Sequence, residues 1–133
     1  MKHYTGSCHC GVVRFEADID LMAGTRKCNC TLCAKVRNWV VIVKSDAFKL
    51  VSGGDNLTDY QWGAKTIHFL FCKTCGVRLF GKGHLDALGG DFYAVNVASL
   101  DNVDPAELAQ VPVRFSDGRN SNWQSPPEHT RHL

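Results

Sequence analysis

The alternation of apolar and polar residues predicts a chain of short β-strands. Val12-Val13-Arg14-Phe15-Glu16-Ala17 alternates after a cysteine-bearing turn, which is typical of a half-buried strand. The continuous apolar run Trp39–Val43 is typical of a buried strand. About eight strands are expected in all, with turn residues between them. They span 12–17, 25–28, 39–43, 48–51, 57–62, 66–71, 77–81 and 92–97.

Little helix is expected. Thr31 is a suitable N-cap for a helical turn through Lys35, and Asp104 can cap a short helix that has Pro105 in its first turn. The glycine-containing segment 83–91 is expected to be a loop. From Asp117 the chain is polar, and Trp123 is expected to anchor it. We therefore predict one mainly β, mainly antiparallel, zinc-stabilised domain over residues 1–116, followed by a C-terminal tail over residues 117–133.

Composition restricts the function classes. With 133 residues, 44% of them hydrophobic and 21% charged, the chain suits one globular domain. No apolar run approaches the roughly 20 residues that cross a bilayer, and residues 1–7 lack the apolar core of a secretory signal. A cytoplasmic, reducing location is therefore expected, in which clustered cysteines favour metal binding over disulfides.

The net charge gives no support for nucleic-acid binding. The formal value of +2 counts the cysteines as neutral. With seven thiolates around two Zn²⁺ ions it would become −1. On charge alone we therefore expect no nucleic-acid partner, and the sequence has no dense Lys/Arg run with interleaved aromatic residues.

Four of the seven cysteines form two chelating pairs. Cys72-x-x-Cys75-Gly76 has the form of a zinc knuckle, and Cys8-x-Cys10-Gly11 is a tighter pair. In the knuckle, Gly76 is expected to take the left-handed conformation that a tight turn needs. Joined across the fold, the two pairs would make a closed four-cysteine structural zinc site. The alternative is that these are ordinary buried cysteines.

The other three cysteines lie within six residues, as Cys28-x-Cys30-x-x-Cys33. Three protein ligands and an open fourth position are the general form of a catalytic zinc site. Two alternatives remain. A histidine, with His9, His68 and His84 as candidates, could complete a second structural site, or Cys30 and Cys33 could be redox-active thiols.

Zinc held by three thiolates is a weak Lewis acid that suits a soft fourth ligand. A substrate thiol fits that description, and it would be presented to an electrophile such as an aldehyde. The basic residues that flank Cys28, Cys30 and Cys33 could pair with carboxylates of an anionic thiol or form a solvated face. They are Arg26, Lys27, Lys35 and Arg37.

The three cysteine motifs resemble the glutathione-dependent formaldehyde-activating enzyme family, whose relatives include centromere protein V. The resemblance rests on Gly6-Ser7-Cys8-His9-Cys10-Gly11-x-Val13-x-Phe15, on the Cys28–Cys33 motif, and on Phe71-Cys72-x-x-Cys75-Gly76-x-x-Leu79-Phe80. It implies a fold of curled antiparallel sheets. It also implies a structural zinc on Cys8, Cys10, Cys72 and Cys75 and a catalytic zinc on Cys28, Cys30 and Cys33.

The resemblance further implies a carbon–sulfur lyase whose substrates are a thiol such as glutathione and a small aldehyde such as formaldehyde. His9 and His68 are candidates for the acid that protonates the hemithioacetal oxygen, and the alternative for each is a surface or packing residue. The alternatives are a non-enzymatic zinc module that binds protein or nucleic acid, and a thiol redox switch. Exposed strand edges make a homodimer possible.

Overall fold

Ten strands in two sheets make up most of the molecule. The computed structural model describes residues 1–133. The strands are β1 (Lys2–Ser7), β2 (Arg14–Ile19), β3 (Thr25–Cys28), β4 (Trp39–Lys44), β5 (Phe48–Ser52), β6 (Leu57–Tyr60), β7 (Ile67–Cys72), β8 (Arg78–Leu85), β9 (Gly90–Asn96) and β10 (Val113–Ser116). The two α-helices, α1 (Thr31–Val36) and α2 (Pro105–Leu108), are short. Neither has the length and apolar character that a membrane span requires.

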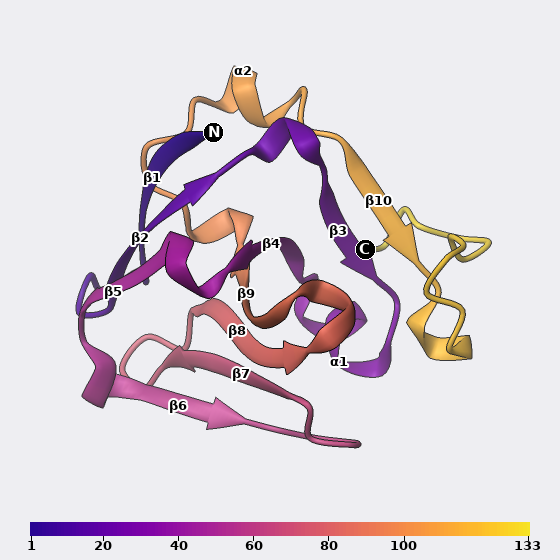
Figure 1. Cartoon of the computed structure of the whole chain (residues 1–133), viewed down its shortest axis with the longest axis horizontal. Coiled ribbons are helices and arrows are strands. Elements are labelled where there is room, and N and C mark those ends of the chain that lie inside the picture. Colours follow the sequence, from indigo (N-terminus) through magenta and orange to yellow (C-terminus); the bar gives the residue numbers. More distant parts are fainter.

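The larger sheet curls around one side of the molecule. Its seven strands have the order β10-β3-β4-β9-β8-β7-β6, and the smaller sheet has the order β1-β2-β5. All pairs are antiparallel except β10 with β3. Figure 1 shows the large sheet turning from β10 and β3 on the right to β6 and β7 at the bottom. The mainly β fold of curled antiparallel sheets with little helix is confirmed. The division at residue 116 stays a prediction.

Aromatic side chains join the two sheets. Phe48, where β5 begins, stacks on Phe15 of β2 with ring centroids 5.3 Å apart and on Tyr93 of β9 at 4.0 Å. Phe80 of β8 lies 4.7 Å from Phe48. Because rings from both sheets meet here, burial of this cluster couples formation of the small sheet to formation of the large one.

Three parts of the fold differ from the sequence prediction. One is β10, to which no strand was assigned and which pairs in parallel with β3. Residues 2–7 form β1, to which no strand was assigned, and it pairs with β2 along its whole length. The predicted loop over 83–91 is wrong, because β8 continues to Leu85 and pairs with β9 from Gly90 onward. Gly83 lies opposite Phe92, and a Cβ there would come within 3.1 Å of the Phe92 ring. Its glycine therefore makes room for a buried ring within a strand.

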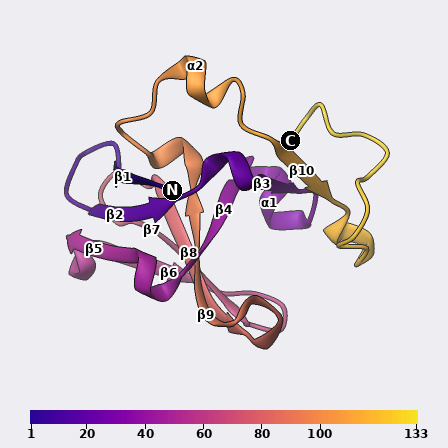
Figure 2. The ribbon, with the colours of Figure 1, turned by 45° about the horizontal axis from the view of Figure 1, so that its top comes forward.

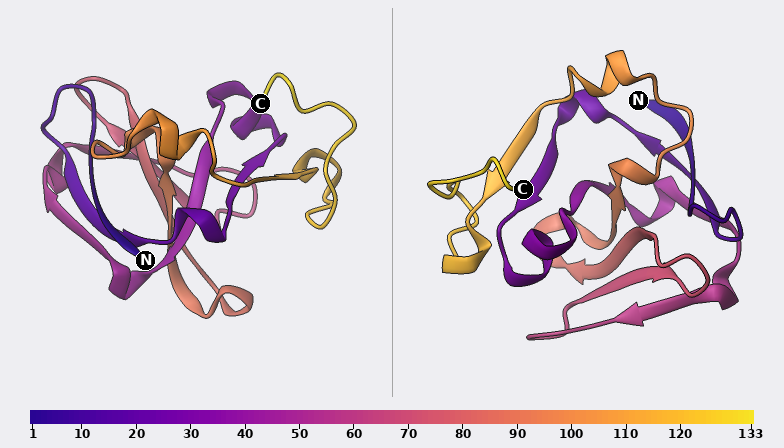
Figure 3. Two further views of the ribbon diagram at one scale, coloured as in Figure 1. Left: turned by 90° about the horizontal axis from the view of Figure 1, so that it is seen from above. Right: turned by 180° about the vertical axis from the view of Figure 1, so that it is seen from behind.

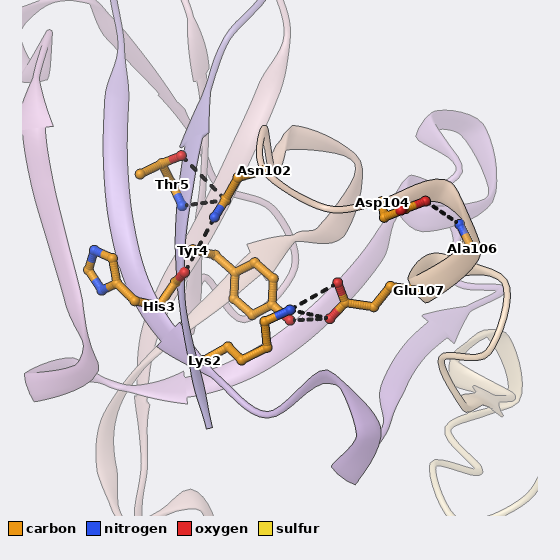
Figure 4. Close-up of polar contacts among 8 residues, drawn as sticks. All are labelled: Lys2, His3, Tyr4, Thr5, Asn102, Asp104, Ala106 and Glu107. Atoms are coloured by element: carbon orange, nitrogen blue, oxygen red, sulfur yellow. Dashed lines mark hydrogen bonds and ion pairs between the residues drawn. The ribbon is translucent and has the colours of Figure 1, made fainter.

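Side-chain contacts of Lys2 and Tyr4 with Glu107 attach β1 to α2 (Figure 4), and we call these contacts the clasp. The Tyr4 hydroxyl donates to Glu107 at 2.6 Å, and Lys2 Nζ lies 3.2 Å from the same carboxylate. Burial raises the pKa of Tyr4 to about 12, and the bond from Tyr4 lowers the pKa of Glu107. The predicted cap is confirmed, because Asp104 accepts from the Ala106 N–H at 2.9 Å and Pro105 begins the helix.

Candidate functional site

The seven cysteines gather into two groups. Within each group all sulfur atoms lie within 4.8 Å of one another, and none forms a disulfide. One group contains Cys8, Cys10, Cys72 and Cys75, and the other contains Cys28, Cys30 and Cys33. The spacing therefore brings together the pairs that the sequence analysis joined, and each group could hold a metal ion. We call them the four-cysteine group and the triad.

The four-cysteine group connects segments that are far apart in the sequence. Cys8 and Cys10 follow β1, whereas Cys72 ends β7 and Cys75 lies in the turn into β8. The sulfur of Cys10 is 3.6 Å from that of Cys8 and 3.7 Å from that of Cys72. Four sulfurs around a zinc ion at about 2.3 Å would be about 3.8 Å apart in a tetrahedron. The spacing thus fits a tetrahedral ion.

Hydrogen-bond donors already surround these sulfurs. The backbone N–H of Val13 donates to Cys8 at 3.4 Å, and the amide of Asn56 donates to Cys72 at 3.4 Å. The backbone N–H of Cys75 contributes most to lowering the pKa of Cys72 to about 6. Gly76, with φ of 77°, takes the expected left-handed conformation. The turn therefore favours the thiolate forms that bind metal.

The triad is built at one strand end and one short helix. Cys28 is the last residue of β3, and Cys30 and Cys33 belong to the start of α1. The helix cap is Cys30, whose sulfur accepts the Cys33 N–H at 3.3 Å, so the prediction of Thr31 as the cap is wrong. The sulfur of Cys30 takes the part that a hydroxyl oxygen usually plays. The helix start thus points a backbone donor at a triad sulfur.

The electrostatics of the triad favour the thiolate form of its middle cysteine, Cys30. Hydrogen bonds from the thiols of Cys28 and Cys33 lower the pKa of Cys30 to about 2. The contact with Cys30 raises the pKa of Cys28, and contacts with Cys28 and then Cys30 raise the pKa of Cys33. Three sulfurs this close share their protons around one thiolate, and a cation that replaces those protons would relieve the repulsion among three thiolates. This donor set, three sulfurs with no oxygen ligand, suits a soft or borderline metal.

No histidine joins either group. His68 pairs with Asp59 at 2.5 Å, His84 pairs with Asp91 at 2.7 Å, and His9 is exposed beside Cys8. The histidines that the sequence analysis considered as a fourth ligand for the triad are therefore elsewhere. The triad offers three protein ligands and the four-cysteine group offers four.

Comparison with known proteins decides the family. A family model described as "Glutathione-dependent formaldehyde-activating enzyme" matches residues 3–115, which include all seven cysteines. The chain belongs to this family. It is also similar to a crystal structure of a Rhodobacter sphaeroides protein, with 33% sequence identity and a TM-score of 0.69. That alignment covers 83% of this chain and 99% of the other, so part of this chain has no counterpart there.

The basic residues around the triad differ in whether their side chains already have partners within the protein. In this family member, Lys27 Nζ donates to the Leu133 carbonyl at 3.1 Å and lies over the Trp39 ring at 5.5 Å. Arg26, Lys35 and Arg37 are exposed. Lys27 is therefore already engaged, and the other three remain available to solvent.

Sequence reasoning missed the asparagines that support the sulfurs. Besides Asn56, Asn38 donates to the Cys33 sulfur at 3.8 Å, a distance typical of a weak bond to sulfur. Asn38 also lines a small hollow between α1 and strands β7 to β9, together with Arg78 and Phe80. Asn38 lies five residues after Cys33, and its polar position before a buried strand was the only signal in the sequence. Asn56 lies 16 residues from Cys72 and gave none.

Proposed function

We propose that this protein is a zinc-dependent enzyme of the carbon–sulfur lyase type. Its substrates would be a glutathione-like thiol and a small aldehyde such as formaldehyde, as the description of its family suggests. The observation that carries the proposal is the division of seven cysteines into a group of four and a group of three. Four sulfurs complete a structural site, and three leave one position for a substrate.

Zinc on Cys8, Cys10, Cys72 and Cys75 would be structural. Sulfur spacings of 3.6 and 3.7 Å and the burial of Cys8 and Cys72 support this role. The ion would tie the end of β1 to the turn after β7. Structural zinc contributes directly to folding, because a preformed site does not exist in the unfolded chain.

A second zinc would be held by Cys28, Cys30 and Cys33. Zinc held there would supply an open fourth position suited to a thiol sulfur and would lower the pKa of that thiol. The chain's own residues hold the three sulfurs in place. The N–H groups of Cys30 and Cys33 donate to the sulfurs of Cys28 and Cys30 at 3.3 Å each, and Asn38 donates to Cys33.

The proposed reaction forms one carbon–sulfur bond. The thiol sulfur adds to the aldehyde carbon, the π electrons of the carbonyl move to its oxygen, and the proton lost by the thiol ends on that oxygen. The product is a hemithioacetal, and the reverse reaction releases aldehyde and thiol. No oxidant or reductant is needed. Because aldehydes add to thiols unaided, proximity and thiolate formation are the effects that the site must supply.

Location and assembly are argued from other features of the chain. Seven free cysteines fit a reducing compartment, so we propose a cytoplasmic protein. A homodimer stays a prediction from the exposed strand edges.

The direct test is NMR exchange spectroscopy on glutathione and ¹³C-formaldehyde, with protein loaded with zinc. We expect wild-type protein to accelerate exchange between formaldehyde and S-hydroxymethylglutathione, and Cys33→Ser to return the rate to that of buffer. Lys49→Gln serves as the control, since Lys49 lies on β5 in the other sheet.

Zinc content separates the possible outcomes. Wild-type protein should hold two zinc ions per chain and Cys33→Ser one. Wild-type protein that holds two zinc ions and leaves exchange at the buffer rate would contradict the proposed reaction. A reversible Cys30–Cys33 disulfide formed with loss of one zinc would instead favour the redox switch.

A further inference from the structure

The C-terminal tail, residues 117–133, lies beside the triad. Figures 2 and 3 show it leaving β10 and folding back near β3 and α1, on the side of the molecule away from β6. The family match ends at residue 115, before the tail begins. The tail therefore lies outside the matched region, at the place where the proposed function needs a substrate to bind.

Asn29, which lies between Cys28 and Cys30, attaches the tail to the triad loop. Its side chain donates to Asp117 at 2.8 Å and accepts the backbone N–H of Arg119 at 3.0 Å. Its carbonyl accepts from Arg119 Nε at 3.2 Å. Three hydrogen bonds on one residue fix the tail relative to the neighbouring sulfurs.

The tail also touches a triad sulfur directly. A Cβ on Gly118 would lie 2.5 Å from the sulfur of Cys28 and 2.6 Å from the ring of Trp123. The sulfur and the indole thus share the space over one glycine. Trp123 keeps 54% of its surface exposed, so its indole forms a wall beside Cys28 that a bound molecule can still reach.

Next to this indole, the guanidinium of Arg119 has donors without a partner. Its Nε is bonded to Asn29, while its two terminal nitrogens have no hydrogen bond or ion pair. The nearest carboxylate in the sequence, Asp117, has its oxygens bonded to Asn29 and Asn120. Arg119 therefore presents the planar pair of donors that fits a carboxylate.

We propose that Arg119 and Trp123 determine the specificity of the triad site for thiols that carry a carboxylate. The guanidinium binds the carboxylate, and the indole packs against the carbon chain that joins it to the sulfur. This inference rests on the proposed function, because it requires a thiol at the triad. It assigns substrate recognition to the tail and not to the basic residues that flank the cysteines.

Two thiols of equal length test the proposal. They are 3-mercaptopropionate and 3-mercapto-1-propanol, titrated calorimetrically into the zinc-loaded full chain in the absence of aldehyde. We expect wild-type protein to bind the acid more tightly than the alcohol. Arg119→Gln should weaken binding of the acid by about tenfold, as expected for a charge-assisted hydrogen bond, and leave the alcohol within about twofold.

Further variants separate recognition from structure. Arg119→Lys keeps the charge but loses the fork, so it should retain part of the preference for the acid. Trp123→Ala should weaken both thiols by a similar factor. Lys49→Gln removes one positive charge from the other sheet and should change neither affinity. Equal losses for both thiols in Arg119→Gln would reveal a merely structural role and overturn the proposal.

The outcomes also distinguish this inference from the function on which it rests. Binding of both thiols with equal affinity to wild-type protein and to Arg119→Gln overturns the specificity and leaves the proposed reaction standing. Binding of neither thiol to wild-type protein with two zinc ions overturns the proposed function and, with it, the role of the tail.

Discussion

The two cysteine groups differ in what surrounds them. In the four-cysteine group, Cys8 is 3% exposed and Cys72 fully buried, and both belong to the hydrophobic core. In the triad only Cys30 is buried, and it lies outside that core. Cys10 is exposed and Cys75 half-buried, so the first group extends from the core to the surface, whereas the second lies at the end of β3 beside the tail.

They also differ in the lengths of chain that they connect. Cys10 and Cys72 are 62 residues apart, so an ion between them closes a long loop. The triad spans six residues and closes almost none. Since the entropy removed from the unfolded chain grows with loop length, the four-cysteine group should contribute most of the stability. Exchange of a fourth ligand at the triad, which the proposed function requires, would then cost little stability.

Replacing one sulfur in each group gives the largest expected contrast. Cys8→Ser should lower the free energy of unfolding by at least about 5 kcal/mol, because structural zinc provides folding free energy in small domains. Cys33→Ser should remove the triad zinc with little change in stability. Thermal denaturation with zinc analysis measures both. Equal destabilisation by the two substitutions would contradict the division of roles.

Removal of metal from wild-type protein tests the same contrast without substitution. With a chromophoric chelator, we expect one zinc to leave first, together with the acceleration of glutathione–formaldehyde exchange. Three ligands hold an ion less firmly than four, and two of the four, Cys8 and Cys72, lie in the core. Circular dichroism should remain native until the second zinc leaves. Loss of native structure with the first zinc would show that the assignment of the groups is reversed.

Two glycine substitutions separate strain from contact. Gly76→Ala, at a φ of 77° with open space around it, should cost about 1 to 2 kcal/mol of stability and leave the triad unaffected. Gly118→Ala would bring a Cβ within 2.5 Å of the Cys28 sulfur and should lower zinc affinity at the triad more than it lowers stability. Denaturation measures stability and zinc competition measures affinity at the triad, and both are measured on each variant. Gly76→Ala should change mainly the first quantity and Gly118→Ala mainly the second.

The sequence was enough to predict the local features of both groups. The spacing of Cys72, Cys75 and Gly76 determines a knuckle from sterics alone, and the seven cysteines divide in only a few chemically sensible ways. Alternation likewise predicted β2 to within two residues at each end, and the continuous apolar run predicted β4 to within one. These features depend on residues that are neighbours in the chain.

What sequence reasoning missed depends on contacts between distant segments. From the sequence, Gly83 indicates a loop. In the structure it lies in a strand, where the Phe92 ring on the adjacent strand occupies the space beside it. Arg119 lies 90 residues from Asn29, so no local pattern relates the tail to the triad. Strand β1 is mostly polar on its outer face and shows its character only by pairing with β2.

The smallest expected effect concerns the clasp that holds β1, the strand leading to Cys8. Tyr4→Phe removes the hydroxyl that donates to Glu107 at 2.6 Å and should cost on the order of 1 kcal/mol at neutral pH. Both zinc ions should remain bound, because no sulfur contact changes. Loss of either ion in this variant would show that the clasp acts on the metal sites.

The difference in stability between wild-type protein and Tyr4→Phe should depend on pH in a defined direction. Glu107 has a lowered pKa in the folded protein, first because of the bond from Tyr4, so its contribution is present above the unfolded pKa and is lost as pH falls through the folded one. Tyr4 has a pKa raised from 10.0 to about 12, mainly by burial, so its contribution is present below the first value and lost as pH rises through the second. The stability gap between wild type and Tyr4→Phe should therefore be widest between about pH 5 and pH 10 and should narrow on both sides. Urea denaturation across this range measures it, and a gap independent of pH would leave the pairing of Tyr4 with Glu107 without a role in stability.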